Sequence, residues 1–443
     1  MTLEDLKYKK IVMVGFEATN RALFYVLRSR FPALQITIAD ANPNVHTPND
    51  PNISLKLGAD YLDRLHEFDV VIRSPGVRYW PELVDVRDRV VTATELFFNE
   101  VKTHTRAKII GVTGSKGKST TCSLIYEVLK VAGKQVFLVG NIDNQDWDIH
   151  NKVTDDSWIV YELSSYMLED FKSWPDIAIM ISMFPEHLDW HGDFNKYANA
   201  KANITRRQHE KDLFIFNASY DELILIADHT HAFKIPVNIN SGFHIEHGDF
   251  YEGGDLVMTS GNMKLLGNHN KENILSVLAV AKMLNIPFQV VHDVVSTFVG
   301  LPHRLERVAK KRGITFFDDA ISTTPESTIV AIEAMERKIG ALILGGQDRG
   351  YDFNNLARTI VKYDVNAVIM LPGAREKITT ALVEAGYAGK RVTAESMEEA
   401  VVACFEHAPK DTIALLSTAS PSYDLFKDYK DKGEQFARAV KQQ

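Results

Sequence analysis

The sequence has 443 residues, of which 45% are hydrophobic and 24% are charged, a composition close to the globular average. At about 100–200 residues per domain, this length excludes a single small binding module and predicts about two to four domains. The net charge of −8 disfavours nucleic acid and anionic membranes as partners, because proteins that bind them usually carry a basic excess.

The two cysteines, Cys122 and Cys404, stand in no CxxC or CxxH pattern. A disulfide framework and a zinc cluster are therefore not expected. Residues 1–10 lack the apolar core of a secretion signal, and no run approaches the roughly 18 consecutive apolar positions of a membrane span. We expect a cytoplasmic protein without membrane insertion.

Short apolar runs rich in β-branched residues recur along the chain, each followed by a helix-like segment. They are 10–15, 35–40, 69–74, 108–114, 136–140, 158–163 and 177–182. Such alternation is typical of βαβ units and parallel sheets, so we predict an α/β protein. Residues 241–266 differ: several glycines and short alternating segments predict antiparallel hairpins.

Two segments have the composition of joints between domains. Residues 97–107 are polar and precede a new strand. Residues 299–304 contain Gly and Pro and lie between a helical region and the next predicted strand, ITFFDD. We therefore expect domains at 1–100, 101–301 and 302–443.

The first strand leads into GFEATN at residues 15–20. In a G-x-G-x-x-G frame that starts at Gly15, the second and third glycines are replaced by Glu17 and Asn20, so the close approach of a dinucleotide pyrophosphate is not provided for. The segment therefore argues against an NAD oxidoreductase. A Rossmann-like domain is still expected, with Asp40 at the end of a strand as a candidate ribose partner.

A glycine-rich phosphate loop is the strongest chemical signal in the chain. In residues 111–130, a buried-type strand runs into a glycine-rich turn and then into an amphipathic helix. Gly114 and Gly117 let the backbone approach phosphate oxygens, Lys118 can reach the β- and γ-phosphates, and Ser119 can hold Mg²⁺. The loop has the variant form T-G-x-x-G-K-S, and it predicts nucleoside triphosphate binding.

Two polar groups follow the next buried strands. Glu162 ends one strand and is suited to hold Mg²⁺ on the nucleotide. Residues 185–204 then collect His187, His191 and Lys201 after an apolar strand. The two histidines lack a third soft ligand with matching spacing, so the segment predicts a polar site rather than catalytic zinc.

Eight motifs occur in an order and spacing that resemble the Mur ligase superfamily over nearly the whole chain. They are TGSKGKST (113–120), GNI (140–142), ELSSYMLE (162–169), EHLDWHG…Y..AK (186–201), GNHNKEN (267–273), HRLE (303–306), LILGGQDRG (342–350) and LLSTASPSYDLFKDYKDKG (415–433). Within that family, the sequence is most similar to the members that add glutamate to UDP-N-acetylmuramoyl-L-alanine in peptidoglycan synthesis.

The resemblance implies an ATP-dependent amide ligase that works through an acyl phosphate, with two Mg²⁺ ions. It also implies a Rossmann-like amino-terminal domain for the UDP part, a central P-loop ATPase-like domain, and a Rossmann-like carboxy-terminal domain for glutamate. The expected partners are UDP-N-acetylmuramoyl-L-alanine and glutamate, and the expected state is a monomer.

The resemblance also assigns residues. The catalytic and metal-binding residues would be Lys118, Ser119, Glu162, His187 and Lys201, the last as a carbamate. The ATP contacts would be Thr113, Gly114, Ser115, Lys116, Gly117, Lys118, Ser119, Thr120, Asn270, Asn273, Arg304 and Asp319. The contacts to the other substrates would be Thr19, Asp40, Ser74, Asn141, Thr323, Arg349, Ser422 and Tyr429.

One position departs from the family pattern. Ile321 stands where a lysine that binds D-glutamate is expected, while Thr323 keeps a matching hydroxyl. A lost charge-assisted contact is worth roughly 1.5–3 kcal/mol, so use of L-glutamate is the alternative. A folylpolyglutamate-synthetase-like ligase and a non-catalytic nucleotide-binding protein are further alternatives. The first is disfavoured by the complete domain before the phosphate loop, and the second by the joint presence of Lys118, Glu162, His187 and Lys201.

Overall fold

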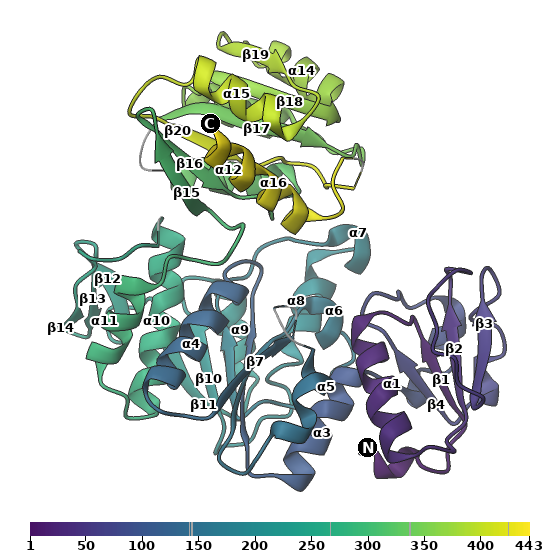
Figure 1. Ribbon diagram of the computed structural model, residues 1–443. Coiled ribbons are helices and arrows are strands. Elements are labelled where there is room, and N and C mark those ends of the chain that lie inside the picture. Colours follow the sequence, from purple (N-terminus) through teal and green to yellow (C-terminus); the bar gives the residue numbers. More distant parts are fainter. Residues whose placement is uncertain (141, 143–144, 266, 336–337, 424) are drawn as a thin grey trace. The chain divides into compact units, whose positions relative to one another are not determined.

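The computed structural model describes residues 1–443 apart from 141, 143–144, 266, 336–337 and 424 (Figure 1). The described residues form two compact units, one of residues 1–261 and 271–294 and the other of residues 262–270 and 295–443. Within them the strands form three sheets. The expected α/β class with parallel sheets is confirmed, whereas the division into three domains remains a prediction.

The first sheet is parallel throughout, in the order β3-β2-β1-β4-β5. Its strands are β1 (Ile11–Val14), β2 (Ile36–Asp40), β3 (Ile53–Leu57), β4 (Val70–Arg73) and β5 (Val90–Val91). The helices of this region are α1 (Ala18–Arg30), α2 (Pro81–Val84) and α3 (Ala93–His104). All four residues of β1 are buried, as expected for the central strand of a sheet covered on both faces.

The second sheet has the order β14-β13-β12-β11-β10-β9-β6-β8-β7. Its strands are β6 (Lys108–Thr113), β7 (Val136–Gly140), β8 (Trp158–Glu162), β9 (Ile177–Met180), β10 (Leu213–Asn217), β11 (Phe233–Val237), β12 (Phe243–Glu246), β13 (Asp249–Glu252) and β14 (Asp255–Met258). The pairs from β7 to β12 are parallel, and the pairs among β12, β13 and β14 are antiparallel, which confirms the predicted hairpins.

Helices of very different length follow these strands. They are α4 (Lys118–Val131), α5 (Asp146–Ile149), α6 (Ser165–Leu168), α7 (Leu188–His191), α8 (Phe194–Ala202), α9 (Asp221–Asp228), α10 (Asn268–Met283) and α11 (Phe288–Thr297). The Asp193 side chain caps α8 by accepting from the Lys196 amide at 2.8 Å, which satisfies one free donor of the first turn.

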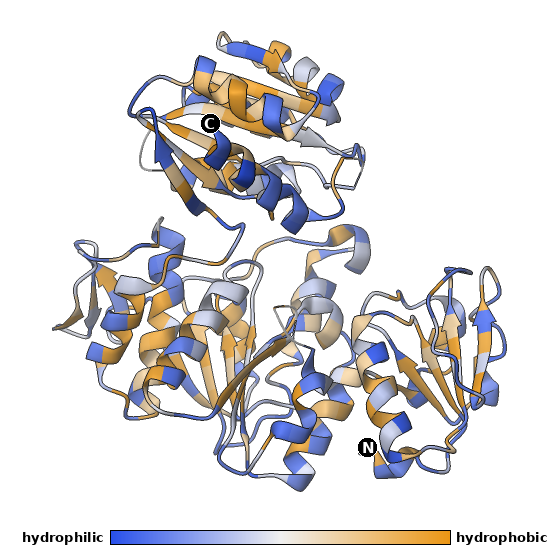
Figure 2. Cartoon of the chain, viewed as in Figure 1, coloured by the Kyte–Doolittle hydropathy of each residue, from blue (hydrophilic) through white to orange (hydrophobic). Residues whose placement is uncertain are grey.

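The third sheet has the order β15-β16-β20-β17-β18-β19 and is parallel except for the β15–β16 pair. Its strands are β15 (Glu306–Lys311), β16 (Ile314–Asp318), β17 (Ile339–Gly346), β18 (Ala367–Gly373), β19 (Lys390–Thr393) and β20 (Ile413–Leu416). Its helices are α12 (Pro325–Ala334), α13 (Asn354–Lys362), α14 (Arg375–Glu384), α15 (Met397–His407) and α16 (Tyr429–Gln442). In Figure 2, the inner strands of this sheet are mainly hydrophobic and α16 is mainly hydrophilic.

The first and second sheets share one apolar cluster. It includes Ile11 of β1, Phe97 of α3 and Tyr161 of β8, all fully buried, and the indole of Trp147 donates to the Ala93 carbonyl at 3.2 Å. Burial of these apolar side chains stabilises the packing of α3 and α5 between the two sheets. Among the described residues, no helix is long and apolar enough to cross a membrane.

Candidate functional site

The phosphate loop connects β6 with α4 and holds its shape through hydrogen bonds to the segment after β9. The Ser115 amide donates to the Ser182 carbonyl at 3.0 Å, and the Lys116 amide donates to the Ser182 hydroxyl at 3.0 Å. Gly117, the residue before α4, has φ +88°, which a residue with a side chain rarely adopts. Because Gly117 comes directly before the helix, the backbone amides at the start of α4 lie next to the loop.

Lys118 is the first residue of α4, and its side chain folds back over the loop. Its Nζ donates to the Gly114 carbonyl at 3.0 Å and to the Ser115 carbonyl at 3.2 Å. The eight residues from Thr113 to Thr120 that the sequence predicts as ATP contacts therefore occupy one continuous strand end, loop and helix start. Their roles in binding remain predictions.

Glu162 lies beside this loop because β8 pairs with β6 in parallel, with Glu162 opposite Val112. The side chain is buried, and its Oε2 has no hydrogen-bond partner among the described residues. A buried carboxylate oxygen without a partner costs free energy, so it is available to a cation. Oxygen donors of this kind, with the Ser119 hydroxyl, suit Mg²⁺.

Lys201 projects from α8 onto the same loop. Its Nζ donates to the Gly114 carbonyl at 2.8 Å and to the Thr113 hydroxyl at 3.2 Å, and the residue is only 1% exposed. Burial and the nearby Lys118 ammonium hold the pKa of Lys201 well below its usual range. The structure therefore brings Lys118, Glu162 and Lys201 to one edge of the second sheet.

The two histidines of the same segment have different surroundings. His187 is exposed, precedes α7 with φ +54°, and its ring lies 5.0 Å from the Tyr166 ring. His191 is buried, its Nε2 lies 3.1 Å from the Ser165 hydroxyl, and burial together with the nearby His187 lowers its pKa to about 4. Neither histidine belongs to a cluster of three possible metal ligands among the described residues.

Tyr197 belongs to the motif at 186–201, but sequence reasoning assigned it no role in the site. Its hydroxyl donates to the Ser115 hydroxyl at 3.0 Å, and its ring lies 4.9 Å from the Lys201 Nζ. Helical spacing on α8 is the signal that could have found it, because Tyr197 and Lys201 are four residues apart and share a face. Asn273 also lies at the loop, since a Cβ on Gly117 would overlap its amide; Asn270 stands one turn earlier on α10.

In the first sheet, the predicted substrate residues lie near the carboxyl ends of adjacent strands. Asp40 ends β2, and its Oδ2 accepts from the Phe16 amide at 2.7 Å. The Ser74 hydroxyl, just after β4, donates to the Glu17 carboxylate at 3.3 Å, and the Thr19 hydroxyl donates to Gln145 at 3.0 Å. Asn141 lies outside the described residues.

In the second unit, Arg304 and Asp319 are brought together. Asp319 is buried, accepts from the Ser417 hydroxyl at 2.7 Å, and accepts from the Leu305 amide at 3.3 Å. Burial raises the pKa of Asp319 to about 6, against the opposing effects of these hydrogen bonds and of the Arg304 charge.

Of the predicted glutamate contacts, Thr323, Arg349 and Ser422 lie on loops that follow strands of the third sheet, and Tyr429 is the first residue of α16. Ser422 is buried, and its hydroxyl has no partner among the described residues, so it can accept or donate a bond to a ligand. Arg349 is exposed and donates to Gln347 at 2.9 Å, and the half-buried Tyr429 stacks edge-on against His303. Thr323 is half-buried in the loop before α12, which also contains Ile321.

Lys432 of α16 is a buried cation that sequence reasoning did not single out. It is 1% exposed and donates to the Thr418 hydroxyl at 2.5 Å. Burial lowers the pKa of Lys432 to about 8, while the charges of Asp318 and Asp319 act in the opposite direction. Lys432 therefore places an ammonium group close to Asp318 and Asp319, although position 321, where a lysine is expected, is an isoleucine.

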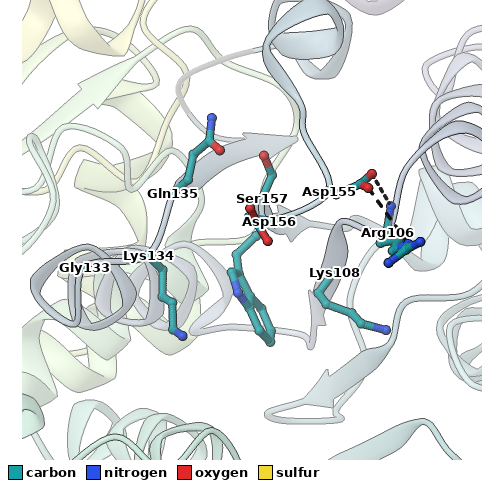
Figure 3. A pocket seen from close by; sticks show the side chains of 9 residues that line it. Arg106, Lys108, Gly133, Lys134, Gln135, Asp155, Asp156 and Ser157 are labelled. Atoms are coloured by element: carbon teal, nitrogen blue, oxygen red, sulfur yellow. Dashed lines mark hydrogen bonds and ion pairs between the residues drawn. The ribbon is translucent and has the colours of Figure 1, made fainter.

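A surface cavity of 440 Å³ lies at the other end of the second sheet (Figure 3). Its lining includes Lys108 and Trp158, which begin β6 and β8, so it is remote from the phosphate loop at their carboxyl ends. Arg106 pairs with Asp155 at 3.9 Å, and Lys108 pairs with Asp176 at 2.8 Å. Two of the three cations in the lining therefore already have carboxylate partners, and Asp155 and Asp156 line the same cavity, which disfavours an anion there.

Comparison with known families matches two segments of the chain. Residues 112–281 match the Mur ligase middle domain, and residues 303–419 match the glutamate ligase domain of Mur ligases. The UDP-N-acetylmuramoylalanine--D-glutamate ligase of Geobacillus sp. (strain WCH70) is 34% identical, with 98% of this chain and 97% of that protein covered. The enzyme of the same name from Streptococcus thermophilus (strain CNRZ 1066) is 30% identical, with 99% and 98% covered.

Solved structures share the fold at lower identity. The UDP-N-acetylmuramate-alanine ligase MurC from Thermotoga maritima has a TM-score of 0.62 at 17% identity, with 98% of this chain and 100% of that chain covered. The MurF ligase from Thermotoga maritima in complex with ADP has a TM-score of 0.60 at 16% identity, with 99% of each chain covered. A bifunctional folylpolyglutamate synthase/dihydrofolate synthase from Yersinia pestis CO92 has a TM-score of 0.59 at 13% identity, with 78% of this chain and 92% of that chain covered.

Proposed function

This chain belongs to the Mur ligase family, and from that membership we propose that it is an ATP-dependent ligase of the MurD class, which joins D-glutamate to UDP-N-acetylmuramoyl-L-alanine. The observation that carries the proposal is the convergence of Lys118, Glu162 and Lys201 on one edge of the second sheet. The names of full-length relatives support the choice of substrates. We expect a cytoplasmic monomer.

The reaction takes place in two transfers. The carboxylate of the alanyl substrate attacks the γ-phosphorus of ATP, the bond to ADP breaks, and an acyl phosphate forms. The glutamate amine then attacks the acyl carbon, loses a proton, and inorganic phosphate leaves as the amide forms. Lys118 and the amides of α4 supply positive charge where the phosphoryl oxygens lie, which is the main task of a protein in phosphoryl transfer.

Two magnesium ions fit the donor set of this site. Ser119 and Glu162 would hold one ion on the nucleotide, and the unpartnered Oε2 of Glu162 supports that role. His187 and a carbamylated Lys201 would hold the second, because Lys201 matches the family lysine that carries this modification. When bound, the ions supply positive charge to the phosphate oxygens.

The remaining contacts divide between the substrates. Asn270, Asn273, Arg304 and Asp319 would contact ATP, and Thr19, Asp40, Ser74 and Asn141 would contact the UDP-muramoyl part. Thr323, Arg349, Ser422 and Tyr429 would contact glutamate. The hydroxyl of buried Ser422, which has no partner among the described residues, supports this assignment, and an arginine at position 349 can bind a carboxylate with two hydrogen bonds.

The deciding experiment is phosphate release from ATP in the presence of UDP-N-acetylmuramoyl-L-alanine, with D-glutamate, L-glutamate or no amino acid, and with the product mass measured. We expect release that depends on D-glutamate and a product heavier by one glutamyl residue. Dependence on L-glutamate would establish the alternative stereochemistry. Phosphate release that needs neither amino acid would contradict a ligase and indicate a nucleotide-dependent protein without ligation.

Two variants sharpen this assay. Lys118→Ala should abolish phosphate release. Near-normal turnover in this variant would contradict the role of Lys118 in phosphate binding.

Ile321→Lys restores the family residue, and we expect it to lower the KM for D-glutamate about tenfold, because a charge-assisted contact is worth roughly 1.5–3 kcal/mol. An unchanged KM would mean that other groups, such as Lys432, already balance the charge of glutamate in this chain.

A further inference from the structure

Arg73 is the last residue of β4, directly before the Ser74–Gly76 turn. It is 0% exposed, which is unusual for an arginine. The buried guanidinium lies on the Tyr79 ring at 4.5 Å from the centroid. A fully buried cation needs hydrogen-bonded partners, and Arg73 has them on two sides.

On one side, Arg73 holds the turn of its own sheet. Its Nη1 donates to the Val77 carbonyl at 2.5 Å, which closes the loop that begins at Ser74. The Ser74 amide donates to the Val14 carbonyl at 2.8 Å, so the turn is also joined to β1. The turn therefore lies at the carboxyl edge of the first sheet, where open α/β sheets bind ligands.

On the other side, Arg73 holds the end of α6 beside the second sheet. Its Nη2 donates to Asp170 Oδ2 at 3.1 Å, across 97 residues of sequence, and lies 3.6 Å from Glu169 Oε2. Helix α6 begins three residues after Glu162, the carboxylate at the phosphate loop. One rigid guanidinium thus joins the turn of the first sheet to the segment that carries Glu162.

Stability is a poor explanation for this arrangement. Desolvating an arginine and a carboxylate costs several kcal/mol, and hydrophobic replacements for buried ion pairs are often as stable. What the arginine supplies, and an apolar pair would not, is two directed hydrogen bonds at once, one to the Val77 carbonyl and one to Asp170, with the Glu169 carboxylate 3.6 Å away. Its placement therefore points to a geometric role.

We propose that Arg73 is a positioning residue that holds the Ser74–Gly76 turn against α6, so that an acceptor bound at this turn presents its carboxylate to the phosphate loop. This inference rests on the proposed function, because it assigns the acceptor to the first sheet. It goes beyond that function in assigning a role to Arg73 and Asp170, which lie outside the residues expected to touch a substrate.

The first test compares Arg73→Met with Arg87→Met. Arg87 also pairs with Asp170, at 2.9 Å, but its side chain is 59% exposed, so it is a matched control. We expect Arg73→Met to lower kcat/KM for UDP-N-acetylmuramoyl-L-alanine about tenfold or more, since a small displacement of a reacting group has effects of this size. The KM for ATP should stay close to the wild-type value, because the hydrogen bonds of Arg73 within the described residues go to Val77 and Asp170 and not to the phosphate loop or α4. Equal losses for both substrates, or for both variants, would overturn the proposal.

A double variant separates positioning from stability. Arg73→Met alone leaves Asp170 buried with one partner lost, so the melting temperature of the protein should fall. Adding Asp170→Leu removes that charge, and the melting temperature should recover while kcat/KM for the acceptor stays low. Recovery of kcat/KM together with the melting temperature would reduce Arg73 to a structural role and refute the inference.

Hydrogen exchange tests the same role without turnover. In the absence of substrate, the amides of residues 74–80 and 166–171 should exchange faster than in the wild type in Arg73→Met and in the double variant. In Arg87→Met, they should exchange at the wild-type rate. Unchanged exchange in Arg73→Met would refute the positioning role even if the enzyme is active. A wild-type protein without ligase activity would instead refute the proposed function, and the exchange rates would still decide whether Arg73 holds the turn.

Discussion

Lys201 places an amine inside the phosphate-loop region, where it donates to a backbone carbonyl and a hydroxyl. Carbamylation would replace that cation by a carboxylate-like group on the same buried stem. We therefore predict that Lys201→Ala loses at least about tenfold in activity, since loss of a metal-binding group usually costs that much, and that added formate or acetate restores part of it. The measurement is phosphate release at increasing carboxylate concentration.

The matched control for this experiment is Lys196→Ala, on the same helix. Lys196 is exposed and pairs with Asp193 at 3.8 Å, so its loss should leave activity near normal and insensitive to carboxylates. Absence of rescue in Lys201→Ala would argue against carbamylation, and equal stimulation of both variants would show that the carboxylate acts elsewhere.

Glu17 lies between β1 and α1, at the carboxyl edge of the first sheet. It stands before α1, where a Rossmann-like loop normally has glycine, and its carboxylate lies against the Ser74–Gly76 turn. A Cβ on Gly76 would already touch it, at 2.9 Å from Oε2. The Glu17 carboxylate therefore joins the loop before α1 to the Ser74–Gly76 turn.

Among the elements, α3 contacts both the amino-terminal segment and α1 through Glu100. Glu100 is buried and accepts from the Leu3 amide at 3.0 Å and from Arg30 at 2.5 Å. Burial alone would raise its pKa, but the nearby His150 ring, at 3.9 Å, and the hydrogen bonds from Leu3 and Arg30 outweigh it and lower the pKa of Glu100 to about 2. The ionised carboxylate is therefore preferred in the folded state.

This preference predicts a pH dependence with a definite sign. Glu100 has a folded pKa of about 2 against 4.5 when unperturbed, so its contribution to stability is present above pH 4.5 and lost as the pH falls toward 2. Glu100→Gln should therefore unfold at lower urea concentration than the wild type at pH 6. The difference between the two should shrink steadily as the pH falls below 4.5.

An exposed glutamate serves as the control. Glu127 of α4 pairs with Lys130 at 3.5 Å on the surface, and such pairs contribute little, so Glu127→Gln should follow the wild-type curve at every pH. A difference between the wild type and Glu100→Gln that grows toward low pH would contradict the assigned direction of the pKa shift.

At the scale of the whole molecule, the described residues form two units with separate apolar cores. Phe214 is fully buried in the first, and Phe316 is fully buried in the second. Truncation of a buried phenylalanine to alanine costs about 3–5 kcal/mol. We predict two calorimetric unfolding transitions. Phe214→Ala should lower the midpoint temperature of one, and Phe316→Ala that of the other. A single transition that both substitutions lower equally would show that the two cores unfold cooperatively.

Much of the fold and the site was readable from local sequence. The seven apolar runs before residue 183 all became strands, because β-branched runs flanked by turn residues need no distant information to be extended. The phosphate loop was predictable for the same reason, since its strand, glycines, lysine and helix are consecutive. Glu162 could be placed beside it because parallel strands bring their carboxyl ends to one edge.

Contacts between distant segments were beyond such reasoning. The bond from Arg73 to Asp170 spans 97 residues, and the burial of Lys432 beside Asp318 and Asp319 depends on how α16 packs. Periodicity and turn chemistry act over a few residues, so the local sequence determines strands, loops and the consecutive parts of a binding site. Which charges become buried together depends on the packing of whole elements, because that packing alone sets which side chains lose water and which partner remains within reach.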